Sequence, residues 1–359
     1  MRAALGAGLL ALWAGGCGEA EQPLQVMVAA DQGVAREVFD EFGRQQGEQV
    51  GAVYDSEAAK TTAAARILGA AGPGEFDLWW SGECWATAQL AQAGLLAPLD
   101  PELVSRWPQQ WRDPQGRWLG FAARVRSVAW DEARLRQAGL TPPADWLELA
   151  TPKWSGGVIA MADPRFGTTR GHLGAMKAWL DRDAGPGAYE MWAAGLARNA
   201  PRIVTDGNSG AVAAVLRGES LVALTDSDDI EAVRGRTRDL VPCALPHRAA
   251  GEGGSVVGAL VFPSTVAIVA GSARTERAKR LAQFIAGPEG EGMLAEGAAA
   301  YLPVAFPGKA TVPAWIEAAA SSPLDVSPAE AAAQMDEAVR VFLDRVRGEA
   351  AGDSSRGSE

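Results

Sequence analysis

The amino-acid sequence predicts an α/β protein in which two parallel-sheet units are joined by more than one crossing of the chain. The chain has 359 residues, 48% of them hydrophobic, which suffices for two cores at about 100–200 residues per domain. Short apolar strands alternate with helices of amphipathic spacing, the pattern of parallel sheets. The alternation restarts after a β-rich stretch at residues 118–130.

The first unit begins with an apolar strand at residues 24–28, followed by a helix in which Val34, Val38 and Phe42 recur at helical spacing. Its further strands are expected at 50–54 and 76–80, and its further helices at 63–70 and 86–93. In such sheets ligands bind at the carboxyl ends of the strands, so we expect a ligand between the two units.

The second unit repeats the pattern of the first. Its strands are expected at 158–162, 202–204 and 221–225, and its helices at 172–180, 211–217 and near Ile230. An apolar, β-rich stretch at 256–270 leads into an amphipathic helix at 275–286. The small and polar residues 347–359 predict a disordered tail.

The charge and the rare residues exclude several functions. The chain has 33 Lys and Arg against 44 Asp and Glu, a net charge of −11, whereas nucleic acid requires a basic footprint. Two histidines, His172 and His247, are too few for a His-rich zinc site. Three cysteines are too few for a disulfide framework, and we expect Cys84 and Cys243 to be separate buried thiols.

The first 16 residues are typical of a secretory signal peptide, with Arg2 before an apolar run at 3–13 and small residues after it. The run is too short to span a bilayer comfortably. Cys17 follows directly, as in the bacterial lipobox, where the cysteine is acylated. We expect an exported protein that is tethered to the membrane through Cys17; an ordinary signal peptide with an incidental cysteine is the alternative.

Polar residues follow several of the expected strands, at the points where helices begin. Four such turns lie at residues 54–57, 166–169, 206–209 and 225–229. Helix N-termini carry unpaired N–H groups and a partial positive charge, so hydroxyls and amides there can bind anions or polar ligands. The same residue types are preferred N-caps. Capping therefore accounts for any one turn, but four turns at strand ends favour a ligand site.

Acidic residues lie at the same strand ends. Asp228 and Asp229 are adjacent, and their repulsion must be relieved by water, a helix start or a cation. Asp31 follows the first strand and Glu83 the third. Four carboxylates that converge on a cleft would suit a hard cation with oxygen ligands.

Arg124 and Arg126 are two residues apart, so on a strand both would face the same side. A guanidinium group there could hold a carboxylate, carbonate or phosphate through two parallel hydrogen bonds; a solvated strand face is the alternative. The sequence contains no nucleophile elbow, Walker loop or HExxH helix. An exported hydrolase with a carboxylate pair and a scaffold lipoprotein with a vestigial cleft remain alternative functions.

Several short motifs keep a specific order along the chain. They lie at residues 76–80 with Glu83, then at 92–96, 116–126, 150–156, 278–281 and 301–304. Over residues 24–305 the chain resembles the extracellular solute-binding proteins of ABC transporters, in the branch of the ferric-iron-binding periplasmic proteins. The resemblance implies a two-lobed type II periplasmic binding protein with a hinge and an interlobe cleft.

The resemblance also implies a division of the chain. We expect a signal peptide at 1–16, a lipid-anchor linker at 17–23, lobe 1 at 24–125 and 250–300, lobe 2 at 126–249 and 301–346, and the tail at 347–359. The protein would be a periplasmic, membrane-anchored lipoprotein and a monomer. It would act as the binding component of an importer, without enzymatic activity, and its partner would be an ABC permease of the inner membrane.

Iron sites of the resembling family use a His or an acid after the first strand, a Glu after the third and two adjacent tyrosines that open a later helix. Here those positions hold Asp31, Glu83, Asp228 and Asp229, which the resemblance implies as ligands of iron or another hard cation. Both tyrosines of the pair are missing, and the chain's tyrosines, Tyr301 among them, lie elsewhere in the sequence.

The family's accompanying anion is held by a hydroxylic helix start, an Asn and an Arg. The resemblance implies that Ser81, Arg124, Gly167, Thr168, Thr169, Asn208 and Ser209 bind such an anion or another polar group. The expected ligand is therefore an iron-type cation with a synergistic anion. A phosphorylated or amine-bearing organic solute is the alternative.

Overall fold

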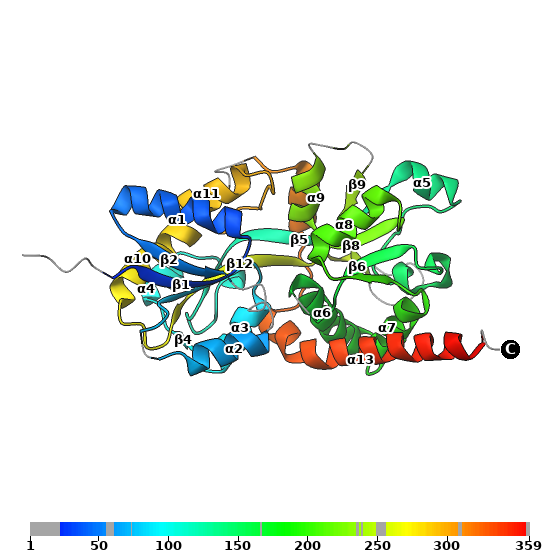
Figure 1. Ribbon diagram of the computed structural model, residues 1–359, viewed down its shortest axis with the longest axis horizontal. Helices are drawn as coiled ribbons and strands as arrows, with labels where there is room; N and C mark the ends of the chain where they lie inside the picture. Colours follow the sequence, from blue (N-terminus) through cyan, green and yellow to red (C-terminus); the bar gives the residue numbers. More distant parts are fainter. Residues whose placement is uncertain are drawn as a thin grey trace, which may run out of the picture.

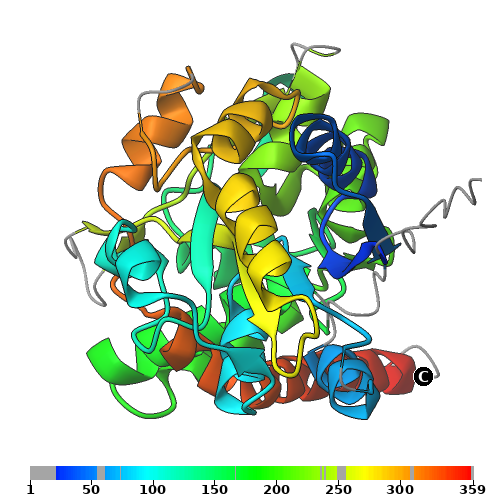
Figure 2. The same cartoon turned by 90° about the vertical axis from the view of Figure 1, so that its left-hand side faces the viewer.

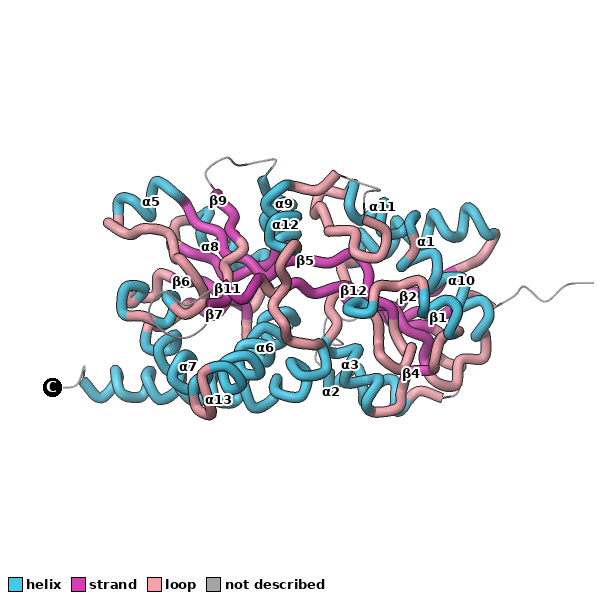
Figure 3. The backbone as a smooth tube through the Cα atoms, turned by 180° about the vertical axis from the view of Figure 1, so that it is seen from behind, coloured by secondary structure: helices cyan, strands magenta, loops and turns pink. Residues whose placement is uncertain are grey.

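A computed structural model describes residues 22–54, 61–72, 74–165, 167–234, 237, 240–248, 256–307 and 311–356. The expected signal peptide, Cys17 and most of the turn at 54–57 lie outside these residues. Within them a ten-stranded mixed sheet runs through the long axis of the molecule, with helices above and below it (Figures 1 and 3). Its path is β2-β1-β3-β12-β5-β8-β6-β7, with β4 beside β12 and β9 beside β5.

One half of the molecule contains the parallel strands β1 (Leu24–Ala29), β2 (Val50–Tyr54) and β3 (Leu78–Ser81), with the short β4 (Leu96–Ala97). Its helices are α1 (Gln32–Gln46), α2 (Thr61–Ala70), α3 (Trp85–Gln92), α4 (Pro101–Ser105), α10 (Thr275–Ala286) and α11 (Pro288–Glu296). Seen end-on, α10 crosses the front in yellow and α1 lies beside it in dark blue (Figure 2). The apolar spacing at 275–286 predicted α10 at its observed bounds.

The other half contains the strands β6 (Ile159–Ala162), β7 (Arg202–Val204), β8 (Val222–Asp226) and β9 (Leu240–Cys243). Its helices are α5 (Glu132–Gln137), α6 (Gly167–Asp183), α7 (Ala188–Arg198), α8 (Gly207–Arg217) and α9 (Ser227–Arg234). The strands β10 (His247–Arg248) and β11 (Val256–Gly258) form a separate antiparallel pair. The helix α12 (Ala314–Ala320) lies near α9 (Figure 3).

Two long antiparallel strands connect the halves. They are β5 (Leu119–Asp131) and β12 (Val261–Val269). The first part of β5 pairs with β12, and its second part, from Arg126 onward, pairs with β8. Because one strand belongs to both halves, residues a few positions apart on β5 contact different halves of the molecule.

Separate aromatic cores stabilise the two halves. Trp80 and Phe39 pack edge to face in one core, with ring centroids 5.4 Å apart. Trp146, Trp154 and Trp179 lie in the other and are almost fully buried. Burial of each such ring stabilises the fold by about 1.5–3 kcal/mol. The exact lobe boundaries stay a prediction.

The C-terminal helix α13 (Pro328–Arg356) corrects the expected tail, because it continues helically from residue 347 to Arg356. Its apolar residues recur at helical spacing and pack against α6 and α7 along the lower edge of the molecule (Figure 1). The Tyr189 hydroxyl donates a 2.7 Å hydrogen bond to the Ala338 carbonyl. Gly174 allows close packing, since a Cβ atom there would come within 2.4 Å of the Ala331 carbonyl oxygen.

Candidate functional site

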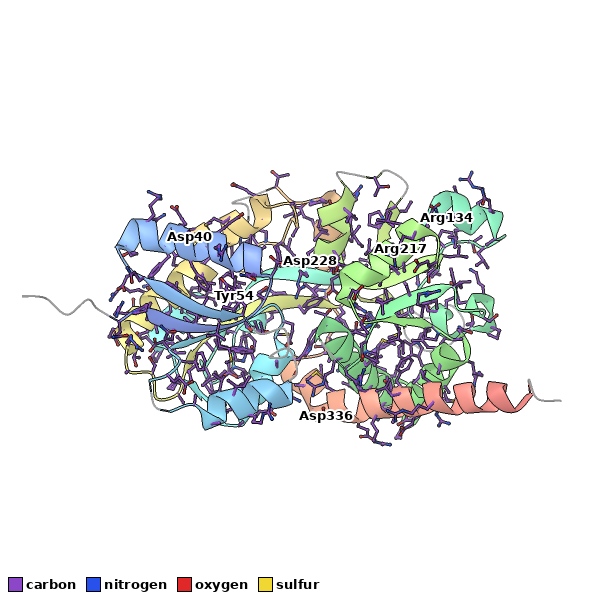
Figure 4. The ribbon with its side chains drawn as sticks, viewed as in Figure 1. Asp40, Tyr54, Arg134, Arg217, Asp228 and Asp336 are labelled. Carbon is purple, nitrogen blue, oxygen red and sulfur yellow. The ribbon has the colours of Figure 1, made fainter. Side chains whose placement is uncertain are left out.

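Three aspartates surround the junction of β8 and α9. Asp226 ends the buried strand, and Asp228 and Asp229 lie in the first turn of the helix, where the helix dipole favours negative charge. One carboxylate oxygen from each residue lies within 4.8 Å of the others. Figure 4 places Asp228 at the middle of the molecule, where the two halves meet.

Asp226 is fully buried and its carboxylate is well supplied with donors. It faces Arg126 in the register of β5 and β8, and Arg126 Nη1 donates to Asp226 Oδ1 at 2.9 Å. Asn208 Nδ2 donates to Oδ2 at 2.6 Å, and the Thr168 hydroxyl donates to the same oxygen. The Thr169 hydroxyl accepts from Arg126 Nη2 at 3.2 Å. The structure thus brings Thr168, Thr169 and Asn208 together, around a carboxylate.

Asp228 and Asp229 are less well satisfied. Asp228 Oδ2 accepts from Arg124 Nη1 at 3.0 Å and from the Tyr301 hydroxyl at 3.4 Å. Asp228 Oδ1 is buried and has no hydrogen-bond donor among the described residues. Burial raises the pKa of Asp228, and burial with repulsion from Asp228 raises that of Asp229 well above its ordinary value. Both carboxylates would be stabilised by additional positive charge.

Arg124 links the two halves at this site. Its guanidinium donates to Asp228 of α9 and to the Gly82 carbonyl in the loop after β3. It also lies 4.8 Å from the centroid of the Phe262 ring and 5.8 Å from that of Tyr301. Burial would lower the pKa of Arg124, but Asp228, Tyr301 and the other two aspartates together outweigh it and raise the pKa above its ordinary value. Arg124 therefore stays charged.

Charge does not balance within this cluster. The three aspartates meet two guanidinium groups, those of Arg124 and Arg126. One negative charge is in excess when all five groups are ionised. Since charges taken out of water are costly unless paired, the cluster can accept one proton or a cation.

Glu83 does not join the three aspartates. Its carboxylate accepts from the backbone N–H groups of Trp85 at 2.5 Å and Ala86 at 3.1 Å, at the start of α3. Ser81, the candidate at the end of β3, donates to Glu83 Oε1 at 3.5 Å. Burial raises the pKa of Glu83 despite these hydrogen bonds. Glu83, which we expected in a four-carboxylate site, therefore caps the start of α3 instead.

Three further candidates lie at helix starts outside the aspartate cluster. Asp31 is exposed and accepts from Val34 N at 3.1 Å as the N-cap of α1. Ser209 is exposed, and its hydroxyl donates to the Asp206 carbonyl at 3.2 Å. Gly167 begins α6 at φ +51°, a conformation that glycine adopts readily. These residues do follow strands, as the sequence predicted, but the structure does not bring them together in one cluster.

Tyr301 is a site residue that the sequence did not reveal. Backbone hydrogen bonds of 2.7 and 2.9 Å between Ala123 and Leu302 hold the segment of Tyr301 beside β5. Burial, and then the Asp228 carboxylate, raise the pKa of Tyr301, so its hydroxyl remains a donor. The sequence signal for this segment was the motif at residues 301–304. Where that motif lies in space depends on the pairing of Ala123 with Leu302, which are far apart in the sequence.

The histidines and cysteines do not contribute to the cluster. Arg126 Nε donates to His172 Nδ1 at 3.4 Å, and burial lowers the pKa of His172 well below its ordinary value. Burial lowers the pKa of His247 to about 4. Cys84 and Cys243 are separate free thiols, as expected, but only Cys84 is buried and Cys243 is partly exposed.

A separate cavity of about 420 Å³ lies between α3, the loop at 109–118, β12 and the residues that lead into α13. Trp85, Trp111 and Pro263 are among its lining residues, and the three aspartates are not. Its lining mixes apolar side chains with Arg112, Asp113 and Arg117, and Asp113 is paired with Arg117, so we place the candidate site at the aspartates.

The sequence model of a family described as bacterial extracellular solute-binding protein matches residues 85–321. The chain belongs to this family. No helix in the described part of this solute-binding protein combines the length and apolarity that a membrane span requires.

Curated relatives of this solute-binding protein carry names that refer to iron. The Fe(3+)-binding periplasmic protein of Serratia marcescens is 41% identical over 64 residues, 18% of either chain. Iron uptake protein A1 of Synechocystis sp. is 26% identical over 135 residues, which are 37% of this chain and 35% of that protein. Iron uptake protein A2 of the same organism is 24% identical over 64% of each chain. The match thus spans less than two thirds of each relative's length.

Solved structures confirm the predicted fold. Iron-bound HitA from Pseudomonas aeruginosa has a TM-score of 0.75 and 23% identity, and the match covers 90% of this chain and 99% of that one. AfuA from Actinobacillus pleuropneumoniae, solved with fructose-6-phosphate, has a TM-score of 0.72 and 18% identity, with 91% and 98% covered. The solute-binding protein has the type II periplasmic binding fold, as its resemblance to the ferric-binding proteins implied.

Proposed function

We propose that this solute-binding protein captures a hard, iron-type metal cation at Asp228 and Asp229 and delivers it to an ABC permease of the inner membrane. The observation that carries the proposal is the excess negative charge of the buried aspartate cluster, with one Asp228 oxygen left without a donor. Burial, and then repulsion among the aspartates, raise the pKa values of both residues, and a bound cation would stabilise their ionised forms.

The donor set supports a hard cation. Carboxylate oxygens are preferred by small, highly charged cations, whereas soft metals prefer thiolates, and neither Cys84 nor Cys243, the cysteines of the described residues, lies in the cluster. The names of the curated relatives point to iron. This chain lacks the adjacent tyrosine pair, so Asp228 and Asp229 would supply the negative charge, and the Tyr301 hydroxyl lies 3.4 Å from Asp228.

The position of the cluster supports capture by closure of the two halves. Arg124 contacts Gly82 from one half and Asp228 from the other. A cation bound at Asp228 would change these contacts, and a ligand that binds the closed state better shifts the equilibrium toward it. We expect binding without chemical turnover, which distinguishes this function from that of an exported hydrolase.

An organic cation is the second candidate. The excess negative charge would also suit a protonated amine, and the rings of Phe262 and Tyr301 lie beside Arg124. A phosphorylated solute, such as the one bound to AfuA, is less favoured here. The Thr168 and Asn208 donors that could hold a phosphate already bind Asp226.

Metal titration of the chelator-treated protein tests the proposal. We expect calorimetry to show binding of Fe³⁺ supplied as a weak chelate. Asp228→Asn and Asp229→Asn should each weaken it by about 100-fold or more, beyond the usual effect of losing an outer-shell partner. Asp40→Asn is the matched control, because Asp40 is exposed on α1, away from the cluster (Figure 4).

Two results would contradict this function. One is wild-type protein that binds neither Fe³⁺ nor another hard cation such as Mn²⁺. The other is unchanged metal affinity in both aspartate variants. Stabilisation by putrescine, but by no metal, would favour the organic cation instead.

We also propose that the protein is exported and tethered through Cys17, a residue outside the described part of the chain. Labelling of cells with a palmitate analogue should mark the wild-type protein but not Cys17→Ser. Equal labelling of both would contradict a lipid anchor at this cysteine.

A further inference from the structure

Asp226 lies where two helix starts and a guanidinium group converge. Thr168 is the second residue of α6 and Asn208 the second residue of α8, and both donate to Asp226 Oδ2. Arg126 donates to Asp226 Oδ1 at 2.9 Å. Helix N-termini, hydroxyls, amides and arginines are the groups from which proteins build anion sites.

The donors around Asp226 are almost fully used. Arg126 is fully buried, and its N–H groups reach Asp226, His172, Asn208 and Thr169. A carboxylate offers about four lone-pair positions, and Asp226 uses three of them for Arg126, Asn208 and Thr168. Little capacity is left in this group of residues to hold a separate anion.

We propose that Asp226 is a built-in anion. It neutralises Arg126 and the two helix starts, so that the cation binds Asp228 and Asp229 without carbonate, phosphate or citrate from solution. This inference rests on the proposed function and makes it more specific. It replaces the synergistic anion that the sequence led us to expect at Thr168, Thr169 and Asn208.

The built-in carboxylate has a thermodynamic consequence. A separate anion must be recruited from solution, so cation affinity would rise with the anion concentration through their coupling. Asp226 is instead held opposite Arg126 by the pairing of β5 with β8. Cation affinity should therefore be independent of added anion.

The first arm of the test uses the wild-type protein. Mn²⁺, which stays in solution without a chelating anion, is titrated by calorimetry in a buffer of non-coordinating zwitterions, with and without millimolar carbonate or phosphate, and Fe³⁺ is titrated in the same way as the weak chelate used above. The expected result is the same affinity in all conditions, after correction for binding of the metal by the anion itself. Binding that appears only with added anion would overturn the inference while the proposed function stands. If no cation binds in any condition, the proposed function itself is contradicted.

The second arm restores the missing carboxylate. Asp226→Ala should weaken cation binding by about tenfold or more, and formate, which fits the space vacated by the carboxylate, should restore it. Asp226→Asn fills that space, so formate should not restore its affinity. Asp228→Asn is the control for formate that binds the metal directly. Its asparagine leaves no space for formate, so formate should not restore its affinity either.

Folding of each variant is checked by circular dichroism at low temperature. A folded Asp226→Ala variant that binds the cation as the wild type does, or that formate does not restore, would overturn the inference. If Asp226→Ala does not fold, Asp226→Asn decides the question, because normal affinity in that variant would equally overturn it and weakened affinity supports it. The titration of the wild-type protein tests the inference even if neither Asp226 variant folds.

Discussion

Asp226 and the pair Asp228–Asp229 are separated by one residue, yet their environments differ in kind. Asp226 is 0% exposed and is paired with Arg126, Asn208 and Thr168. The side chain of Asp228 is 13% exposed and still has an oxygen without a donor. Both side chains are largely withdrawn from solvent, and the clearest difference between them is the number of hydrogen-bond donors that each carboxylate receives.

The difference comes from the elements on which the residues lie. Asp226 is the last residue of β8, where strand pairing places it opposite Arg126. Asp228 and Asp229 follow in the first turn of α9, and Asp228 lies where the halves meet (Figure 4). Removing a carboxylate from a fully hydrogen-bonded buried pair leaves its partner unpaired and is strongly destabilising, whereas a buried carboxylate with an oxygen left without a donor and a raised pKa is a candidate for a functional site.

Removal of the structural carboxylate should have the largest effect. Asp226→Ala leaves Arg126 buried without its main partner, which costs about 3–5 kcal/mol in the free energy of unfolding. Urea denaturation measures this loss in the free energy of unfolding. Glu102→Gln is the control, because its ion pair with Arg106 is exposed and should contribute less than about 1 kcal/mol. Equal losses in the two variants would mean that the Asp226 pair is not structural.

Removal of charge from the adjacent pair should act in the opposite direction. Asp229→Asn removes a desolvated carboxylate that Asp228 repels, and Asn still suits a helix start. We expect the metal-free protein to gain about 0.5–2 kcal/mol near neutral pH, the range of other charge optimisations. A loss of stability like that of Asp226→Ala would abolish the distinction between the two carboxylate types.

The pH dependence should separate stability from binding. Because the folded pKa values of Asp228 and Asp229 are raised, their contribution to stability is fully present below the ordinary value of 3.8 and is lost as pH rises through the folded values. Denaturation of the metal-free wild type and Asp229→Asn at several pH values should show their difference shrinking on acidification. Metal affinity should fall over the same acidification, because protons compete for the oxygens. Affinity that is constant through this range would contradict the raised values.

The smallest effect is expected at Tyr301. Tyr301→Phe keeps the ring near Arg124 but removes the hydroxyl that donates to Asp228 at 3.4 Å. Cation affinity should fall by less than about tenfold, in line with about 0.5–1.5 kcal/mol for one hydrogen bond, and stability should hardly change. A loss as large as that of Asp228→Asn would make Tyr301 a direct ligand.

Local patterns predicted much of the fold. The apolar run at 24–28 and the helical spacing at 275–286 identified β1 and α10, because side-chain periodicity depends on neighbours in sequence. The long helix α13 was not predicted, and its last residues, 347–356, include Gly, Asp and Ser, which favour helices weakly. The candidate residues Asp228 and Thr168 were also found locally, because helix starts favour such residue types.

The sequence by itself determined the order of strands and helices and the polar residues that follow the strands, since both depend on contacts within a few residues. Only the tertiary structure decided which of those residues meet. Arg126 finds Asp226 a hundred positions away through strand register, and Tyr301 reaches Asp228 through the pairing of Ala123 with Leu302. Glu83 instead satisfies the N–H groups of its own helix. Partners so distant along the chain leave no periodic signal, because their contact exists only after the chain has folded.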